Sequence, residues 1–440
     1  MTAPDHLRIT GPEDILGFIP HSLGYWPARS LVAMTLQGKR LGATLRVDLP
    51  GEGGGPGRAG SGRAIPGRAG PEGLGAFARS VSSYLEADEH ADGSLLALFT
   101  ETDGDGTPWA ELLSELESAL ADAGMPVRDA WLVGAEFWRN AYCLDPSCCA
   151  PPGRPVEEIR NSRLNAEMVF RGSTVGAAPG TAFLTPPPGT ADPAVLEAQR
   201  DWEQLFSSRT RDRLQFGQVL DVWARVLDTP APGPKLAAEL AGYLRASLCV
   251  PPWRDAVLVM AAAGPEAAER GAEDFGVFDR GTVDPGWGSC LPEPAPGLAA
   301  VAPLPPLDGF PPRSVRHGSD GSRAAAGDEP PPDVPDYGEV LLGMAPPLPD
   351  WTLMARLEGV LEQLCAAGGE AGAAALTGRG WIEWCRGKGS FADALFSRAD
   401  EEHPGYRLAE LLGELVRRGT LCGWARRREA AWQRFEPDVA

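Results

Sequence analysis

Two segments of the 440-residue chain carry too much glycine or proline, and too little apolar surface, to join a hydrophobic core. Residues 51–75 hold eleven glycines and three copies of Gly-Arg-Ala. Residues 264–349 hold seventeen of the 43 prolines and show no sustained hydrophobic period. We therefore expect a disordered insertion at 51–75 and a disordered linker at 264–349. The regions left to fold are residues 1–171, around the insertion, and two helical regions at 172–263 and 350–440.

Within the first region, strand-like and helix-like patterns alternate. Two β-rich runs, Leu31–Leu36 and Leu41–Leu49, flank a glycine-containing turn and predict a hairpin. Helical patterns then alternate with two further apolar runs, Leu95–Thr100 and Ala130–Phe137. This order predicts an α/β domain whose sheet is mixed and partly parallel.

Short motifs predict local features of three helices. Thr10 and Glu13 have the spacing of a reciprocal capping box at the start of the first helix. His21, at the end of that helix, is expected to be a surface or capping residue rather than a base. Arg254 and Asp255 are expected to form a capping pair at the start of a later helix, with the carboxylate near the positive end of the helix.

The region from 350 to 440 carries a pattern typical of helical repeats. Ala392, Phe396, Ala399 and Pro404 are spaced four, three and five residues apart, as in the second helix of a tetratricopeptide repeat. The spacing predicts a tetratricopeptide-like helical hairpin that could present a groove to a peptide. An ordinary helical hairpin that caps the rest of the fold remains open as the alternative.

Charge and hydropathy disfavour two classes of partner. The formal net charge of -20 opposes contact with nucleic-acid phosphates and anionic lipids. A small basic cluster, which we expect to decorate a helix, consists of Arg417, Arg418, Arg426, Arg427 and Arg428. The start of the chain lacks the pattern of an export signal, and the longest apolar stretch, Ala256–Ala263, is too short to span a bilayer. We therefore expect a cytoplasmic protein with reduced thiols and with no nucleic-acid or membrane partner.

The loops that follow the last two predicted strands are the candidate functional region, because open α/β sheets bind ligands beyond the carboxyl ends of their strands. The loop Glu101–Thr107 lacks the complete ligand spacing of a calcium loop and predicts a solvated turn. The second loop contains the stretch CLDPSCCAPPG. The residues expected to line a ligand or thiol site here are Asp48, Trp138, Arg139, Tyr142, Cys143, Cys148 and Cys149.

Cys143, Cys148 and Cys149 place three of the eight cysteines within seven positions. Structural zinc sites normally take two spaced cysteine pairs, and thiol exchange normally takes a Cys-x2-Cys motif, and neither pattern occurs here. A structural, proline-stiffened turn is therefore favoured, with zinc binding and a regulatory disulfide left open as alternatives. We expect no metal and no cofactor.

These segments together resemble an actinobacterial family known as domain of unknown function 4192. The residues that carry the resemblance are Asp14, Pro20, Leu23-Gly24-Tyr25, Pro27, Ser30-Leu31-Val32, Arg46-Val47-Asp48-Leu49-Pro50, Trp138-Arg139, the three clustered cysteines, Pro151-Pro152-Gly153, Arg254-Asp255 and Pro404-Gly405-Tyr406-Arg407. The resemblance covers nearly the whole chain apart from the two low-complexity segments. The family has no established activity, so it implies no catalytic residues.

No complete catalytic set is present, since the chain has neither a Gly-x-Ser-x-Gly nucleophile elbow nor a phosphate-binding loop. The leading hypothesis is a cytoplasmic, non-enzymatic interaction or regulatory protein whose helical C-terminal unit binds a partner protein. The alternative is an enzyme or small-molecule sensor with its site at the strand ends, beside Cys143, Cys148 and Cys149.

Overall fold

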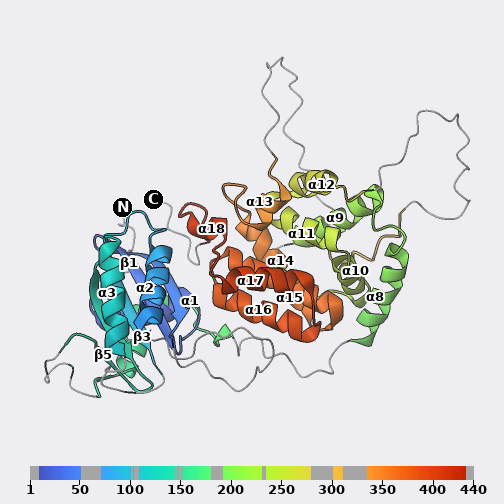
Figure 1. Cartoon of the computed structure of the whole chain (residues 1–440). Coiled ribbons are helices and arrows are strands. Elements are labelled where there is room, and N and C mark those ends of the chain that lie inside the picture. The colour runs from blue at the N-terminus through green and yellow to red at the C-terminus, as the bar shows by residue number, and fades with distance from the viewer. Residues whose placement is uncertain are drawn as a thin grey trace, which may run out of the picture. The chain divides into compact units, whose positions relative to one another are not determined.

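A computed structural model of the chain describes residues 9–50, 71–100, 103, 109–143, 145, 149, 152–179, 192–229, 234–278, 301–310 and 334–432. The chain forms two compact units and passes from one to the other between Ala178 and Pro179 (Figure 1). The first is called the α/β unit and the second the helical unit.

The α/β unit is built on a six-stranded sheet with the order β2-β1-β3-β4-β5-β6. Its strands are β1 (Ser30–Gln37), β2 (Arg40–Asp48), β3 (Gly93–Phe99), β4 (Val127–Val133), β5 (Phe137–Asn140) and β6 (Arg154–Pro155). β3 and β4 are parallel, and every other neighbouring pair is antiparallel. The mixed, partly parallel sheet and its N-terminal hairpin are therefore confirmed.

Helices cover both faces of this sheet (Figure 1). They are α1 (Pro12–Leu23), α2 (Pro71–Leu85), α3 (Ala110–Asp122), α5 (Glu157–Arg160) and α6 (Arg163–Phe170). In β3, Leu96 and Leu98 pack toward α2 and α3, whereas Ala97 and Phe99 pack toward α1. Because β3 is buried on both faces, its sequence is a continuous apolar run rather than an alternating one.

The start of α1 differs from the predicted capping box. The N-cap is Gly11, and its helix has no side-chain cap. Thr10 instead donates from its amide and its hydroxyl to the Asp14 carboxylate, at 2.9 and 2.6 Å. The Thr10–Glu13 prediction is therefore wrong, and Asp14 takes the role expected of Glu13.

His21 is fully buried, so the prediction of a surface or capping residue is wrong. Its Nε2 lies 2.7 Å from the side-chain oxygen of Asn165, and its Nδ1 lies 2.8 Å from the Ser173 hydroxyl. Because the Asn165 oxygen can only accept, Nε2 donates to it. The histidine joins α1 to α6 and to the chain that follows α6.

The helical unit has one hydrophobic core, to which both predicted helical regions contribute. Its helices are α8 (Pro193–Phe206), α9 (Arg213–Leu227), α10 (Ala238–Leu248), α11 (Pro251–Ala263), α12 (Pro265–Asp274), α13 (Tyr337–Leu341), α14 (Trp351–Cys365), α15 (Gly369–Cys385), α16 (Gly389–Glu402), α17 (Arg407–Arg417) and α18 (Gly423–Arg426). Among the described helices, none combines the length and the hydropathy that a membrane-spanning helix requires.

Both low-complexity segments are shorter than expected. Helix α2 begins at Pro71, inside the predicted insertion 51–75, whose residues 51–70 lie outside the described part of the chain. Within the predicted linker, α12 and α13 are helical, and Ala302 and Phe310 are buried in the core of the helical unit. A few apolar side chains anchor these stretches without giving the sequence a helical or strand period.

Three tryptophans of the last helices are buried anchors. The indole nitrogens of Trp381, Trp384 and Trp424 each donate a hydrogen bond of 2.8 Å to a backbone carbonyl. Ala392, Phe396 and Ala399 of α16 are also buried, and α16 packs on α15. The packing is that of a helical hairpin, and its tetratricopeptide-like nature stays a prediction.

Arg254 and Asp255 do not cap α11, which starts at Pro251 with no side-chain cap. The Arg254 guanidinium pairs with Asp255 at 2.7 Å and donates to the Tyr406 hydroxyl at 2.6 Å. The pair therefore joins α11 to the turn before α17, and the predicted capping role is wrong.

Candidate functional site

The parallel strands β3 and β4 end side by side, with Phe99 opposite Val133. Along the same row of the sheet, Asp48 in β2 and Trp138 in β5 are four strands apart. At a strand spacing of about 4.8 Å, this separation is roughly 19 Å. Asp48 is exposed and pairs with Arg46 at 2.6 Å. Its predicted place in one site with Trp138 is therefore wrong.

The single strand predicted from Ala130 to Phe137 is two strands, β4 and β5, joined by a tight turn. Asp103 holds this turn from the loop after β3, because its carboxylate accepts from the amides of Glu136 and Phe137 at 3.2 and 3.0 Å. Gly134 leaves room for it, since a Cβ there would lie 2.1 Å from the Asp103 carboxylate. Asp103 is the one described residue of the predicted solvated loop Glu101–Thr107.

Trp138 and Arg139 belong to β5, so their side chains point to opposite faces of the sheet. Trp138 is buried on the α1 face, where the Arg154 guanidinium lies 4.6 Å from its ring centre. Arg139 is opposite Leu132, which packs with α3. The two residues were predicted to line one site, and the sheet separates them.

The Arg139 side chain is largely buried and has no acidic partner among the residues that the structure describes. The residue is 9% exposed, and its Nε is buried with no hydrogen-bond partner. No ion pair or hydrogen bond joins Arg139 to any residue in the described part of the chain. Burying a guanidinium without a partner costs several kcal/mol, so a group of this kind is rarely left alone.

Strand and helix geometry give an estimate of which part of α3 is level with Arg139. α3 and β5 run in the same direction, and the Tyr142 hydroxyl hydrogen-bonds with Glu117 of α3. Arg139 precedes Tyr142 by three residues, which span about 10 Å of extended chain. The same length of α-helix contains roughly six or seven residues, counted back from Glu117. That position is the start of α3 at Ala110, where Trp109 is the N-cap and no side chain caps the helix.

A guanidinium and a helix start without a side-chain cap are each suited to bind an oxyanion. The guanidinium offers a planar fork of N–H donors, and the helix start offers unpaired backbone amides and a positive dipole end. Glu111, in the first turn of α3, is exposed. The site therefore has donors that match a carboxylate or phosphate group.

Tyr142 follows Arg139 by three residues and contacts Glu117 of α3. Its burial and the neighbouring carboxylate of Glu117 raise the pKa of the Tyr142 phenol, so the ring is neutral at physiological pH. Asn140 shapes the turn that follows, because its side-chain oxygen accepts from the amides of Tyr142 and Cys143 at 2.8 and 3.0 Å. Sequence reasoning missed Asn140 and Asp103, although Asn and Asp near a turn are the usual signal for such backbone contacts.

The clustered cysteines are only partly described. Cys143 and Cys149 are free, Cys143 is half-buried and Cys149 is buried, while Cys148 lies outside the described residues. Among the side chains that the structure places, no group of three or more His, Cys, Asp or Glu residues could hold a metal ion. The described residues therefore add no support for a zinc site or for a regulatory disulfide at these cysteines.

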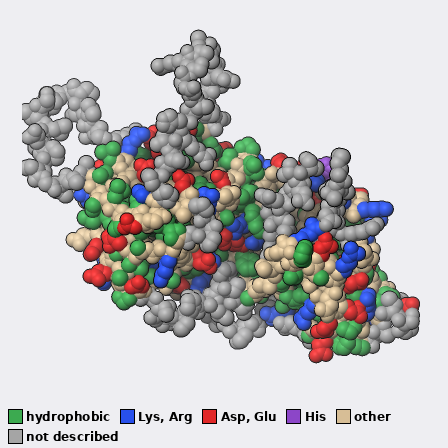
Figure 2. All heavy atoms as spheres, turned by 180° about the vertical axis from the view of Figure 1, so that it is seen from behind, with side chains coloured by type: hydrophobic (Ala, Val, Ile, Leu, Met, Phe, Trp, Pro, Cys, Tyr) green, Lys and Arg blue, Asp and Glu red, His purple; other side chains and the backbone are tan. Residues whose placement is uncertain are grey.

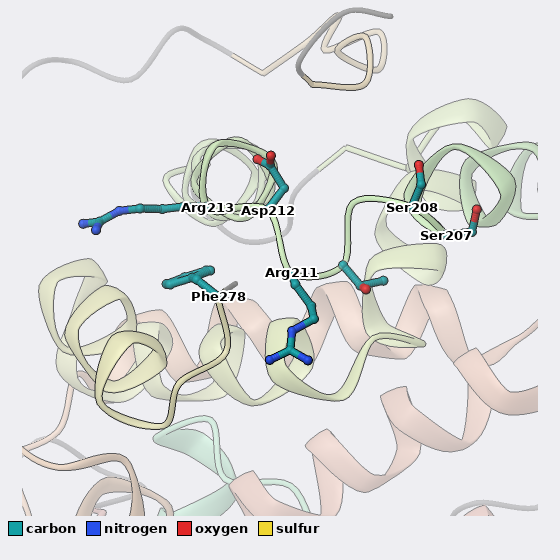
Figure 3. Close-up of a pocket in the computed structure, with 7 residues that line it drawn as sticks. Ser207, Ser208, Arg211, Asp212, Arg213 and Phe278 are labelled. Atoms are coloured by element: carbon teal, nitrogen blue, oxygen red, sulfur yellow. The ribbon is translucent and has the colours of Figure 1, made fainter. Parts of the chain in front are cut away.

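The helical unit has a pocket of about 330 Å³ between α8 and α9. Its lining residues are Ser207, Ser208, Thr210, Arg211, Asp212, Arg213 and Phe278. Figure 3 shows Arg211 and Arg213 pointing in different directions. Asp212 caps α9 through the Gln215 amide, and Arg213 pairs with Glu273, so these charges already serve the fold.

The predicted basic cluster is also engaged by the protein itself. Arg417 and Arg418 pair with Glu414, and Arg427 donates to the carbonyl oxygens of Gly343 and Pro346. On the face drawn in Figure 2, acidic and basic side chains of the described residues are interspersed.

The chain matches a known protein family. The sequence model of a family described as "Domain of unknown function (DUF4192)" matches residues 12–271 and 354–421. The match includes the whole sheet, α3 and most of the helical unit. No curated protein and no solved structure matches the chain.

Proposed function

The chain belongs to the domain of unknown function 4192 family, and we propose that its α/β unit binds a small oxyanion at Arg139, beside the first turn of α3. The ligand class is a molecule with a carboxylate or phosphate group. In this proposal the protein is a cytoplasmic, non-enzymatic regulator that senses such a ligand. The free thiols of the described cysteines suit a reducing compartment.

The observation that carries the proposal is that the largely buried Arg139 side chain has no ion pair or hydrogen bond with any residue that the structure describes. A guanidinium that served only the fold would be expected to donate to a carboxylate or to backbone carbonyls. Arg245 in the helical unit illustrates this, because it is 1% exposed and donates to Gln199 and to the carbonyl oxygens of Leu364 and Gly368. Arg139 is also largely buried, at 9% exposure, but its Nε has no acceptor among the described residues.

The proposal is tested by thermal and urea unfolding of the full chain with and without inorganic phosphate or succinate, at constant ionic strength. A bound anion stabilises the native state by about 2.7 kcal/mol when it is present at 100 times its Kd. We expect one of these anions, or both, to raise the free energy of unfolding in a saturable way. Comparing the two distinguishes a phosphate site from a carboxylate site.

The variant Arg139→Met tests directly whether the anion acts through Arg139. Without added anion, this variant should be more stable than the wild type by about 1 kcal/mol or more, because an unpaired buried charge is removed. It should also lose all stabilisation by phosphate and succinate. Arg128→Met is the matched control, since Arg128 is exposed on β4 and should change stability by less than about 0.5 kcal/mol.

The opposite result would reject the proposal. If Arg139→Met is less stable than the wild type, and neither anion stabilises the wild type, then Arg139 is a structural residue.

An exposed apolar turn of the helical unit favours a second function, the binding of a partner protein. Leu342, Met344 and Leu348 are exposed by 46, 59 and 63% on one short turn. Replacing all three by serine in the full chain should abolish capture of a specific partner protein, whereas Leu214→Ser, on exposed α9 surface, should not. Equal capture by both variants would contradict this role for the turn.

A further inference from the structure

The exposed apolar turn of the helical unit is hydrogen-bonded to α18. The turn follows α13, and its exposed apolar side chains are Leu342, Met344 and Leu348. The amide of Gly423, the first residue of α18, donates to the Leu342 carbonyl oxygen at 3.0 Å. The Trp424 indole donates to the Pro346 carbonyl oxygen at 2.8 Å. These bonds join residues 342–348 and 423–428 into one surface, which we call the α18 surface.

Close packing of two glycines fixes the turn against α18. Gly343 has φ +71°, which favours glycine. A Cβ at Gly423 would lie 2.5 Å from the Gly343 carbonyl oxygen and 2.9 Å from the Met344 sulfur. Only glycine at residue 423 allows this approach, so the exposed Met344 side chain lies directly beside α18.

Arg427 brings a positive charge to the turn. Its Nη2 donates to the carbonyl oxygens of Gly343 and Pro346 at 3.3 and 3.4 Å, which are long for hydrogen bonds. In the part of the chain that the structure describes, no ion pair joins Arg427 to Glu339, Glu429 or another acid, and its Nε has no hydrogen-bond partner. The guanidinium therefore lies against the turn without an acidic partner among the described residues.

Two further arginines are exposed next to Arg427. Residues 423–428 read Gly-Trp-Ala-Arg-Arg-Arg and include no acidic residue, although the whole chain has a formal net charge of -20. Arg426 and Arg428 are both exposed. An apolar surface with cations beside it is complementary to a segment that carries apolar and acidic side chains.

We propose that the α18 surface binds an acidic amphipathic segment of a partner protein. The apolar side chains of that segment contact Leu342, Met344 and Leu348, and one of its carboxylates pairs with Arg427. Burial of the apolar side chains supplies affinity, and the charges supply orientation and selectivity. This inference rests on the partner-binding function proposed for the turn, and it adds the chemical class of the partner.

Selection from a random peptide library displayed on phage, with the full chain as the target, tests the proposal. We expect the recovered peptides to combine Leu, Ile, Phe or Met with Asp or Glu. A synthetic copy of the most enriched peptide should bind at least about tenfold more weakly when its Asp and Glu residues are replaced by Asn and Gln. Arg427→Gln should cause a similar loss, because glutamine can still donate to the two carbonyl oxygens but carries no charge.

Arg426→Glu provides a second variant that does not depend on the contacts of Arg427 within the fold. Because Arg426 is exposed, this variant should fold normally and bind the acidic peptide about threefold more weakly or worse, with a smaller loss at high salt. Lys39→Glu is the matched control, since Lys39 is exposed in the β1–β2 turn of the other unit. It makes the same change of charge and should leave the Kd of the peptide unchanged.

The outcomes distinguish this inference from the function on which it rests. The comparison uses a variant in which Leu342, Met344 and Leu348 are replaced by serine. If the wild type and this variant recover the same peptides, or none, both the partner-binding function and the acidic class are rejected. If the peptides require the turn but lack acidic residues, or bind Arg427→Gln and Arg426→Glu as tightly as the wild type, only the acidic class is rejected. Binding of phosphatidylglycerol vesicles that the serine variant loses would assign the surface to lipid and would also reject the proposal.

Discussion

The Asp14 carboxylate in α1 accepts a hydrogen bond of 3.1 Å from the amide of Leu164, 150 positions further along the chain. Leu164 is in the first turn of α6, so Asp14 satisfies an amide that has no partner within its own helix. The same carboxylate holds Thr10 ahead of α1. The buried Asp14 side chain therefore joins α1, which precedes the six strands in the chain, to α6, which follows them.

Asp14→Ala should lower the free energy of unfolding of the α/β unit by about 1–3 kcal/mol, because it leaves the buried amide of Leu164 unpaired and removes the acceptor of Thr10. Urea unfolding followed by circular dichroism measures the change. Asp48→Ala is the control, since Asp48 is exposed, and it should cost less than about 0.5 kcal/mol. Equal losses in the two variants would contradict the role given to Asp14.

Asp14 should also make stability depend on pH. Burial alone would raise the pKa of this carboxyl, but the hydrogen bonds from Thr10 and Leu164 outweigh burial and lower the pKa below its usual value. The stabilisation is therefore complete above the pKa of the unfolded chain and is lost as the pH falls through the lower, folded value. Unfolding curves from pH 6 to pH 2 should show a smaller acid dependence for Asp14→Ala than for the wild type.

Tyr406→Phe should destabilise the helical unit by about 1–3 kcal/mol, because it leaves a buried Arg254 N–H without its acceptor. A double-mutant cycle with Arg254→Met isolates this interaction. The two losses should not add, since the second substitution removes the donor that the first left unpaired. Strict additivity would mean that the two side chains do not interact in solution.

Gly380→Ala and Gly359→Ala should change stability in opposite directions. A Cβ at Gly380 in α15 would lie 2.5 Å from the Phe396 ring of α16, so alanine should cost about 1–3 kcal/mol by overpacking. A Cβ at Gly359 in α14 meets nothing within 4 Å, so alanine should stabilise that helix by about 0.5–1 kcal/mol. Thermal unfolding of the two variants checks both signs, and a stabilising Gly380→Ala would contradict the close packing of α15 on α16.

The sheet could be predicted where burial leaves a simple pattern. β3 is buried on both faces, and its continuous apolar run identified it directly. The division between β4 and β5 could not be predicted in the same way, because Asp103 holds the turn from more than thirty positions away. The burial of His21 could not be predicted for a similar reason, since its partners Asn165 and Ser173 lie in a later helix and loop.

The residues predicted to line one site lie on different faces and different strands of the sheet. Adjacent residues of a strand point to opposite faces, so recognising β5 as a strand would have separated Trp138 from Arg139. Arg139 itself was named from sequence, but its lack of a partner is a property of the folded chain. Neither the amino-acid composition nor the hydrophobic periodicity of a sequence shows which side chains will be hydrogen-bond partners in the folded protein.

The shared core of the helical unit has a consequence for synthesis. Buried residues from Ala198 to Ala430 pack in this one core, on both sides of the proline-rich segment. Ribosomes release a chain from its N-terminus, so the α/β unit can mature early, whereas α8 to α12 must wait for α14 to α18 before their apolar faces are covered. We therefore expect the apolar faces of α8 to α12 to be accessible to chaperones and prone to aggregation until the last helices have been synthesised.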